Sequence, residues 1–377
     1  MPEPALSLSS ETFEIFLICA PGLEAQLATE AREAGFSQPV TSPGGVTFRG
    51  TWQDVMQANL RLRGATRVLA RIGQFRAFHL AQLDKRARKF PWSTLLRPDQ
   101  AIKVEVTCRK SKIYHAGAAT QRLERAIAEE LGAPISAAAD LVLKVRIDDN
   151  LVTLSLDTSG ISLHKRGHKV AVNKAPMRET MAALFLRQAG YRGDEPVLDP
   201  MCGSGTFVIE AAEIAAGLAA GRSRGFSFER LANFDADAWS ALKSESGDKT
   251  PECRFFGFDR DSGAIRMCHA NAERAGVSNW TQFATQPISE ARPPAAGPGL
   301  VILNPPYGGR IGNKSLLYGL YNSIGDVLKT HFSGWRVGIV TAEGGLARAT
   351  GLPFKPPGPL VAHGGLKVRL SHTAPLP

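Results

Sequence analysis

The first 160 residues alternate between short apolar runs and longer amphipathic stretches. Apolar residues clustered over four to eight positions predict strands, and apolar residues three or four positions apart predict helices. Two sets of five elements follow: Phe13–Ile18, Gly22–Ala34, Gly45–Phe48, Trp52–Leu60 and Val68–Arg71, then Leu80–Lys89, Ala101–Thr107, Ala116–Leu131, Leu141–Ile147 and Leu151–Leu156. The first set reads strand, helix, strand, helix, strand, and the second reads helix, strand, helix, strand, strand. This order predicts small α+β units.

The second half of the chain has a different pattern. Its strand candidates are bare apolar runs, as expected for strands buried on both faces of a parallel sheet, and helical stretches separate them. The runs are Pro196–Leu198, Arg254–Phe258, Leu300–Leu303, Val337–Thr341 and Leu366–Leu370, and the helices are Phe207–Leu218, Ser262–Ala275 and Leu316–His331. We expect Ser262 to cap its helix and Gly221–Glu252 to be a partly helical insertion. The pattern predicts an α/β fold.

A glycine turn follows the first of these runs. The sequence DPMCGSGT occupies Asp199–Thr206, and its glycines Gly203 and Gly205 would let the backbone approach a ligand closely. Amides exposed at the start of the next helix favour an electron-rich group. Position 208 is Val208, so the third glycine of a dinucleotide fingerprint is missing. The turn therefore suits a nucleoside without phosphates.

A second acidic residue ends the next strand candidate. In the sequence RFFGFDRD, Asp259 closes the run and Asp261 follows two positions later. A carboxylate at the carboxyl end of a strand can accept hydrogen bonds from both ribose hydroxyls. Asp259 lies farther from the glycine turn than in a compact nucleotide fold because Gly221–Glu252 intervenes.

The third strand candidate leads into the sequence NPPYG at Asn304–Gly308. Prolines stiffen the turn and leave the Asn304 side-chain oxygen and the Pro305 carbonyl to accept hydrogen bonds from one exocyclic amine. Tyr307 can stack on the ring that carries the amine. Two aligned acceptors would hold that weakly nucleophilic nitrogen pyramidal and aim it at a methyl sulfonium. The pattern predicts transfer of a methyl group to a planar amine.

In this order, the motifs DPMCGSGT, GFDRD and NPPYG resemble those of class I S-adenosylmethionine-dependent methyltransferases that act on amines. Four further segments resemble THUMP-domain RNA methyltransferases, which make 2-methylguanosine in ribosomal RNA and have relatives acting on tRNA: Arg61–Leu69, Ser159–Val170, Ala175–Thr180 and His363–Leu370. The resemblance implies an α/β, Rossmann-like catalytic domain with a mostly parallel seven-stranded sheet at residues 164–377. It also implies a ferredoxin-like α+β domain at 1–72 and a THUMP domain at 73–163.

The resemblance implies roles for individual residues. The loop around the methionine part of S-adenosylmethionine would be Asp199, Pro200, Met201, Cys202, Gly203, Ser204, Gly205 and Thr206. Asp259 would bind the ribose, and Glu179 would lie near the amino acid end of the donor. The target amine would be held by Asn304, Pro305, Pro306 and Tyr307, with Asn304 also next to the donor. Gln286-Pro287 stands where relatives carry an acidic residue near the adenine, and Gly309 replaces another acidic residue.

The charge balance predicts a polyanionic partner. The formal net charge is +10, and residues 1–175 carry 24 Lys and Arg against 17 Asp and Glu. The segment Lys85–Lys112 concentrates basic residues with interleaved aromatic rings, which suits phosphate contacts and base stacking. The expected RNA-binding residues are Arg109, Lys110, Lys112, Lys165 and Arg166. We expect structured RNA as the partner, with ribosomal RNA favoured over tRNA.

The cysteines and the apolar runs limit other interpretations. Five cysteines lie far apart without a C-x-x-C pair, so we expect neither a metal site nor a disulfide framework. No apolar run is long enough to span a membrane, and the first residues lack the pattern of a signal peptide. We expect a cytoplasmic protein that needs no obligate protein partner.

The sequence leaves several functions open. The main hypothesis is methylation of a guanine 2-amino group, with 23S ribosomal RNA as the substrate, and tRNA is the first alternative. The same amine clamp fits an adenine 6-amino group in DNA or RNA and a protein glutamine amide. A non-catalytic RNA-binding or assembly module is an alternative of another class, and the missing third glycine disfavours an NAD-dependent oxidoreductase.

Overall fold

The computed structural model describes residues 12–170, 177–245, 249–252, 254–295, 297–308 and 314–377. The chain forms two compact units. Unit 1 contains the described residues up to Cys19, together with Ala28–Leu163 and Arg224–Glu245. Unit 2 contains Ala20–Leu27 and the described parts of His164–Ser223 and Ser246–Pro377. Gly309 and part of the segment Ala175–Thr180 lie outside the described residues.

Unit 1 is built on one seven-stranded sheet with the order β2-β3-β1-β4-β7-β6-β5. Only β5 and β6 run parallel, and all other neighbours are antiparallel. The strands are β1 (Phe13–Ile18), β2 (Val40–Ser42), β3 (Gly45–Gly50), β4 (Arg67–Arg76), β5 (Ile102–Arg109), β6 (Leu141–Asp148) and β7 (Leu151–Asp157). The domain boundary expected at residues 72 and 73 falls inside β4, where the pairing register shifts between Arg71 and Gly73.

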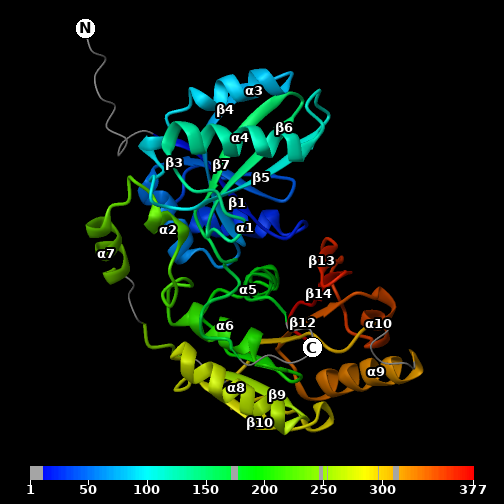
Figure 1. Cartoon of the computed structure of the whole chain (residues 1–377). Helices are drawn as coiled ribbons and strands as arrows, with labels where there is room; N and C mark the ends of the chain where they lie inside the picture. The colour runs from blue at the N-terminus through cyan, green and yellow to red at the C-terminus, as the bar shows by residue number, and fades with distance from the viewer. Residues whose placement is uncertain (1–11, 171–176, 246–248, 253, 296, 309–313) are drawn as a thin grey trace. The chain divides into compact units, whose positions relative to one another are not determined.

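The unit 1 helices match the amphipathic stretches of the sequence. They are α1 (Glu24–Glu33), which spans the division between the units, α2 (Trp52–Arg61), α3 (Leu80–Arg88) and α4 (Ala116–Leu131). Helices α3 and α4 pack side by side, and α4 also packs against β5 (Figure 1). Gly132 ends α4 in a left-handed conformation with a φ of 78°, which glycine adopts without a steric penalty.

The expected insertion contributes to unit 1. Arg224–Glu245 contains a 3-10 turn at Ser227–Arg230 and α7 (Ala236–Ser244). The rings of Phe226 and Phe228 stack at 5.3 Å, and Trp239 meets both edge-on. The Ser227 hydroxyl donates to the Asp140 carbonyl at 2.9 Å. The segment is therefore part of the folded core of unit 1.

Unit 2 contains a second seven-stranded sheet with the order β10-β9-β8-β11-β12-β14-β13. The first five strands in that order are parallel, and β14 pairs antiparallel with both β12 and β13, which confirms the predicted mostly parallel sheet. The strands are β8 (Val197–Asp199), β9 (Phe255–Asp259), β10 (Thr281–Thr285), β11 (Leu300–Leu303), β12 (Arg336–Thr341), β13 (Val361–His363) and β14 (Leu366–His372). Because β8, β9 and β11 are parallel neighbours, the loops after them meet at one edge.

The unit 2 helices are α5 (Glu179–Gln188), α6 (Thr206–Ala215), α8 (Ser262–Ala275), α9 (Lys314–His331) and α10 (Gly344–Ala349). The expectation that Ser262 caps α8 was wrong. Asp261 caps this helix, because its Oδ1 accepts a hydrogen bond from the Gly263 amide at 2.7 Å, and Ser262 is the first helical residue. No helix within the described residues is long and apolar enough to cross a membrane.

Candidate active site

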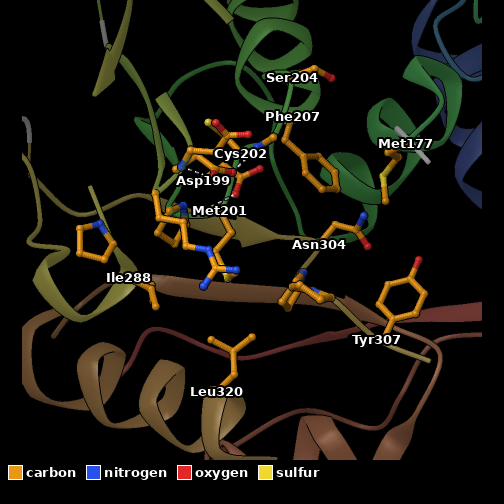
Figure 2. Close-up of a pocket in the computed structure, with 18 of the residues that line it drawn as sticks. Met177, Asp199, Met201, Cys202, Ser204, Phe207, Ile288, Asn304, Tyr307 and Leu320 are labelled. Atoms are coloured by element: carbon orange, nitrogen blue, oxygen red, sulfur yellow. Dashed lines mark hydrogen bonds between the residues drawn. The ribbon is translucent and has the colours of Figure 1, made fainter. Parts of the chain in front are cut away.

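A pocket of about 730 Å³ lies in unit 2 where the loops after β8, β9 and β11 meet. Figure 2 shows Asp199, Met201 and Cys202 on one side of it, Asn304 and Tyr307 on the other, and Phe207 between them. Its lining comes from separate segments of the chain: Met177, Asp199–Ser204, Thr206, Phe207, Asp259–Asp261, Pro287, Ile288, Asn304–Tyr307, Leu316, Leu317 and Leu320. The three sequence motifs therefore meet at one cavity.

The glycine turn joins β8 to α6 in the expected way. Gly203 and Gly205 have φ values of 55° and 83°, a region that favours glycine. A Cβ atom at Gly203 would meet no atom within 4 Å, whereas one at Gly205 would lie 3.2 Å from the Cys268 sulfur. Gly203 thus leaves open space beside the backbone at the pocket, and Gly205 allows close packing behind it.

Two carboxylates face each other across this turn. Asp199 is buried and accepts a hydrogen bond from the Met201 amide at 3.0 Å. Asp259 accepts from the Gly203 amide with one oxygen and from the Asp261 amide with the other, both at 3.0 Å. Burial raises the pKa of Asp199 well above its usual value, and the nearby charge of Asp259 adds to the increase, while the Met201 amide opposes it. The site therefore favours a cationic ligand.

The Asn304–Tyr307 turn presents an acceptor that no described residue satisfies. The Oδ1 atom of Asn304 is buried and has no hydrogen-bond partner among the described residues. Pro305 and Tyr307 are buried, whereas Pro306 is exposed. A buried acceptor without a donor costs about 1–3 kcal/mol. A ligand that donates a hydrogen bond to Asn304 would remove this cost.

Glu179 lies behind the pocket lining, at the start of α5. Its carboxylate is 3.1 Å from the Lys169 Nζ atom, which also donates to the Thr206 hydroxyl at 2.8 Å and the Met177 carbonyl at 3.0 Å. Burial raises the pKa of Glu179, and the Lys169 charge opposes the increase. Glu179 is thus linked through Lys169 to two residues that line the pocket.

The two basic residues expected in the linker differ in their surroundings. Lys165 is exposed, but Arg166 is buried with only 2% of its surface accessible. A guanidinium nitrogen of Arg166 lies 3.2 Å from Glu210 on α6, and both side chains are almost fully buried. Arg166 therefore ties this segment to α6 and does not present its charge to a phosphate, contrary to the surface position expected from the sequence.

The other expected RNA-binding residues lie in unit 1. Arg109, Lys110 and Lys112 are all exposed. They follow one another at the end of β5, whose last residue Arg109 pairs with Asp148 of β6.

Sequence reasoning missed the apolar part of the pocket. Met177, Phe207, Leu316, Leu317 and Leu320 line it, but an apolar residue in a helix or loop carries no chemical signature. Pro287 and Ile288 also line the pocket, on the loop that follows β10. The pocket lining is therefore apolar at the place where relatives were expected to carry an acidic residue near the adenine.

The cysteines and other possible metal ligands show no cluster. Among the described residues, no group of three or more His, Cys, Asp or Glu side chains is arranged to hold a metal ion. The Cys202 and Cys268 sulfurs lie 3.7 Å apart, and both residues are buried. The Cys268 contact and burial both raise the pKa of Cys202, which agrees with a packing role for this thiol.

The fold of unit 2 and the pocket at its sheet edge define a class I methyltransferase. Three family models match the chain: the RlmL ferredoxin-like domain at residues 14–69, the THUMP domain at 78–157 and the RMKL-like methyltransferase domain at 166–352. The chain belongs to the THUMP-domain class I S-adenosylmethionine-dependent RNA methyltransferases. The family expected from the sequence and its fold class are thereby confirmed.

Relatives of known name agree with this family. The Synechocystis protein slr0064, named provisionally as an RNA methyltransferase, is 32% identical, and the match covers 98% of both chains. Ribosomal RNA large subunit methyltransferase K/L of Syntrophotalea carbinolica is 35% identical over 89% of this chain and 50% of its own length. The chain therefore spans about half the length of the K/L relatives it matches.

Solved structures share the whole architecture. A possible methylase from Clostridium difficile has a TM-score of 0.87 at 28% identity, covering 97% of this chain and 99% of its own. A Listeria monocytogenes protein, named as a predicted N6-adenine-specific DNA methylase, has a TM-score of 0.86 at 28% identity, covering 98% of both chains. SMU.472, named provisionally as a methyltransferase and complexed with S-adenosylhomocysteine, has a TM-score of 0.86 at 26% identity, covering 98% of this chain and 99% of its own.

Proposed function

We propose that this protein transfers a methyl group from S-adenosylmethionine to the exocyclic 2-amino group of a guanine in large-subunit ribosomal RNA. The observation that carries the proposal is the buried Asn304 oxygen, which lacks a donor and belongs to a residue lining the donor-sized pocket. An exocyclic amine supplies the missing donor. The names of the K/L relatives support RNA of the large subunit as the substrate.

The pocket offers groups for each part of the donor. Asp259 lies at the end of β9, where a carboxylate can accept both ribose hydroxyls, and Pro287 and Ile288 offer an apolar surface to the adenine. The backbone around Gly203 leaves space for the methionine part. Burial raises the pKa of Asp199, and a positively charged sulfonium or ammonium group beside it would stabilise its carboxylate form. Lys169, held by Glu179, lies behind Thr206 and can support this end of the site.

The chemistry requires positioning more than acid–base catalysis. The amine nitrogen attacks the methyl carbon, the new nitrogen–carbon bond forms as the sulfur–carbon bond breaks, and the donor becomes a neutral thioether. The surplus proton on nitrogen then leaves to water. Asn304 Oδ1 and the Pro305 carbonyl would accept from the two amine hydrogens and direct the nitrogen lone pair at the methyl group. Tyr307 would stack against the base.

The guanine must leave its stack to enter such a pocket. We assign the initial contact with RNA to the exposed basic residues of unit 1, because Arg109, Lys110 and Lys112 can bind phosphates. Lys165 is exposed and can contribute, whereas Arg166 is committed to Glu210.

A second candidate is methylation of an adenine 6-amino group. The Listeria relative is named for that reaction on DNA, and the Asn304 clamp fits any planar amine. RNA is preferred over DNA because two K/L relatives, 35% and 32% identical, are named for ribosomal RNA. Guanine is preferred over adenine because the resemblance to THUMP-domain RNA methyltransferases implies it. Transfer RNA remains the alternative substrate for the same guanine chemistry.

The experiment uses the purified protein, isotopically labelled S-adenosylmethionine and separate pools of unmodified ribosomal RNA, tRNA and DNA. Mass spectrometry of the digested nucleosides identifies the product and the substrate together. Labelled 2-methylguanosine in ribosomal RNA alone is the expected result. Labelled 6-methyladenine in any pool would replace the guanine assignment, and 2-methylguanosine in tRNA alone would replace the substrate.

A further inference from the structure

Two exposed aromatic rings stand at one edge of unit 1. Tyr114 is 83% exposed, more than any other large apolar side chain that the structure describes, and Phe78 is 40% exposed. The Nζ atom of Lys112 lies over the Phe78 ring at 5.6 Å from its centroid. Exposed aromatic rings beside cations are typical of surfaces that stack nucleobases. We propose that Phe78 and Tyr114, with Lys112, form a platform for unpaired RNA bases.

Hydrogen bonds hold the segments of this platform together. The Lys112 amide donates to Asn150 Oδ1 at 2.8 Å, and the Asn150 amide donates to the Ser111 hydroxyl at 3.0 Å. The Ala77 amide donates to the Asn150 carbonyl at 3.0 Å. The loops that carry Phe78 and Tyr114 are thus both fixed to the turn between β6 and β7. A preorganised surface loses less entropy when it binds a ligand.

The backbone at this edge adopts conformations that cost free energy. Among described residues other than glycine, only four have a positive φ, and three of them are Lys110, Asp149 and Asn150. Asp149 and Asn150 form a tight hairpin turn, in which such angles are normal. Lys110 has no such explanation, and its φ of 45° costs about 1 kcal/mol or more. Strained residues of this kind concentrate at functional sites.

The charges around the rings favour RNA over an apolar protein partner. Five basic residues and two acidic residues lie at the ends of the strands that meet here: Arg76, Arg109, Lys110, Lys112, Arg146, Asp148 and Asp149. A hydrogen bond from Arg146 and the charges of Arg109 and Lys110 lower the pKa of Asp148. Stacking requires a free base face, which duplex RNA does not offer, so the ligand is a single-stranded segment.

This inference rests on the proposed function only in taking RNA as the partner. It adds a contact that is independent of charge, because the rings of Phe78 and Tyr114 are uncharged, whereas Lys112 both flanks the Phe78 ring and can bind a phosphate. Removing Tyr114 should therefore weaken binding without changing its dependence on salt. Removing Lys112 should change both the affinity for RNA and its dependence on salt, since each phosphate contact contributes to the salt dependence.

The experiment measures binding of the full-length protein to a short single-stranded RNA that contains 2-aminopurine, whose fluorescence falls when it stacks. Tyr114→Ala should weaken binding about tenfold, in line with loss of one base stack, and should reduce the quenching. Tyr114→Phe should restore both. Val40→Ala is the matched control, because Val40 is 63% exposed on β2, which lies at the opposite edge of the unit 1 sheet from β5. Melting temperatures should stay equal because these side chains are exposed.

Unchanged affinity and quenching in both Tyr114→Ala and Phe78→Ala would overturn the platform. Equal affinity for the same RNA as a duplex would overturn it as well. If the wild-type protein methylates RNA but Tyr114→Ala changes neither affinity nor quenching, the platform is rejected and the proposed function stands. Tyr114-dependent binding in a protein that methylates no RNA would reject the proposed function alone.

Discussion

At the scale of single residues, the Oδ1 atom of Asn304 faces the pocket without a donor among the described residues, so it is free to accept a hydrogen bond from a bound amine. We predict that Asn304→Ala lowers the rate of methyl transfer at least 100-fold, as expected when a positioned hydrogen bond to the reacting group is lost. Donor affinity should change less than threefold. The melting temperature should stay equal or rise, because an unsatisfied buried acceptor is removed. Single-turnover kinetics and a donor titration measure these effects.

Asn233→Ala is the matched control for this variant. Asn233 also has a buried side-chain oxygen without a partner among the described residues, but it lies in unit 1 and does not line the pocket. Its removal should leave transfer unchanged. Equal losses of donor affinity and rate in Asn304→Ala would show that Asn304 holds the donor and not the amine.

We predict that donor binding is coupled to loss of a proton from Asp199. Burial raises the pKa of Asp199, and a cationic donor would lower it again, so binding releases protons near that pKa. Donor affinity should therefore increase as the pH rises through the titration range of Asp199. Calorimetry in buffers of different ionisation enthalpy measures the released protons. Asp199→Asn should abolish the release, and an undiminished release in that variant would contradict the assignment.

The residues of the pocket were predictable to different degrees. Asp199, Gly203, Asp259 and Asn304 stand out in the sequence because their types and positions at strand ends limit the chemistry they can support. Lys169 was hidden, since a lysine in a basic linker usually faces solvent, and only the fold shows it between Glu179 and Thr206. No pattern in the sequence marked the apolar residues that line the pocket.

At the scale of elements, a buried ion pair joins the segment before α5 to α6. Arg166 and Glu210 are both almost fully buried, so removing one partner takes the counter-charge at 3.2 Å away from the other. We predict that Arg166→Met lowers the free energy of unfolding by about 3–5 kcal/mol, and that adding Glu210→Leu recovers much of the loss. Chemical denaturation measures both.

The exposed pair between Arg61 and Glu245 is the control for the buried pair. Its distance of 3.3 Å is close to the 3.2 Å of the buried pair, but its side chains are 35% and 66% exposed. Arg61→Met should cost less than about 1 kcal/mol. Similar losses in both variants would contradict the role assigned to burial.

Elements were predictable where their hydrophobic pattern was periodic. In unit 1 the sequence identified β6 and α4, whose buried and exposed positions alternate with the period of a strand or a helix. It missed the three-residue strand β2 and ended β4 at Arg71 instead of Arg76. Helix α5 gave no such signal, since residues from Glu179 to Leu186 are buried all round and the period disappears. The cap of α8 was misplaced by one residue, because Asp261 and Ser262 are adjacent and both residue types favour that position.

At the scale of the whole molecule, the surplus of positive charge should determine RNA affinity. We predict that Lys110→Glu with Lys112→Glu weakens RNA binding for all sequences and reduces the slope of log affinity against log salt by about 1.4, or about 0.7 for each single-strand phosphate contact. Titrations at several salt concentrations measure the slope.

Lys329→Glu with Lys355→Glu is the control for charge. These lysines are exposed in unit 2, and the change in formal charge is the same. This variant should keep the wild-type slope. An equal reduction in both variants would mean that total charge, and not the end of β5, controls binding.

The domain organisation was only partly visible in the sequence. The order of elements predicted small α+β units followed by an α/β fold, and the resemblance to the family implied the ferredoxin-like, THUMP and Rossmann-like domains, but two features of the connectivity depend on tertiary packing. Strand β4 is long enough to join the first two regions in one sheet. The segment Arg224–Glu245 comes from the middle of the catalytic region and joins unit 1 through the hydrogen bond from Ser227 to Asp140 and through packing of α7 against α2. Neither the joining of two regions by β4 nor the packing of residues 224–245 in unit 1 is marked by a local pattern in the sequence.

The central claim is that the pocket of unit 2 methylates the 2-amino group of a guanine in ribosomal RNA. Its most direct test is quantitative mass spectrometry of ribosomal RNA nucleosides from cells that lack the protein, complemented with the wild type or with Asn304→Ala. We expect 2-methylguanosine to be reduced in the deleted cells and restored by the wild type alone. Unchanged 2-methylguanosine after deletion, or full restoration by Asn304→Ala, would contradict the account.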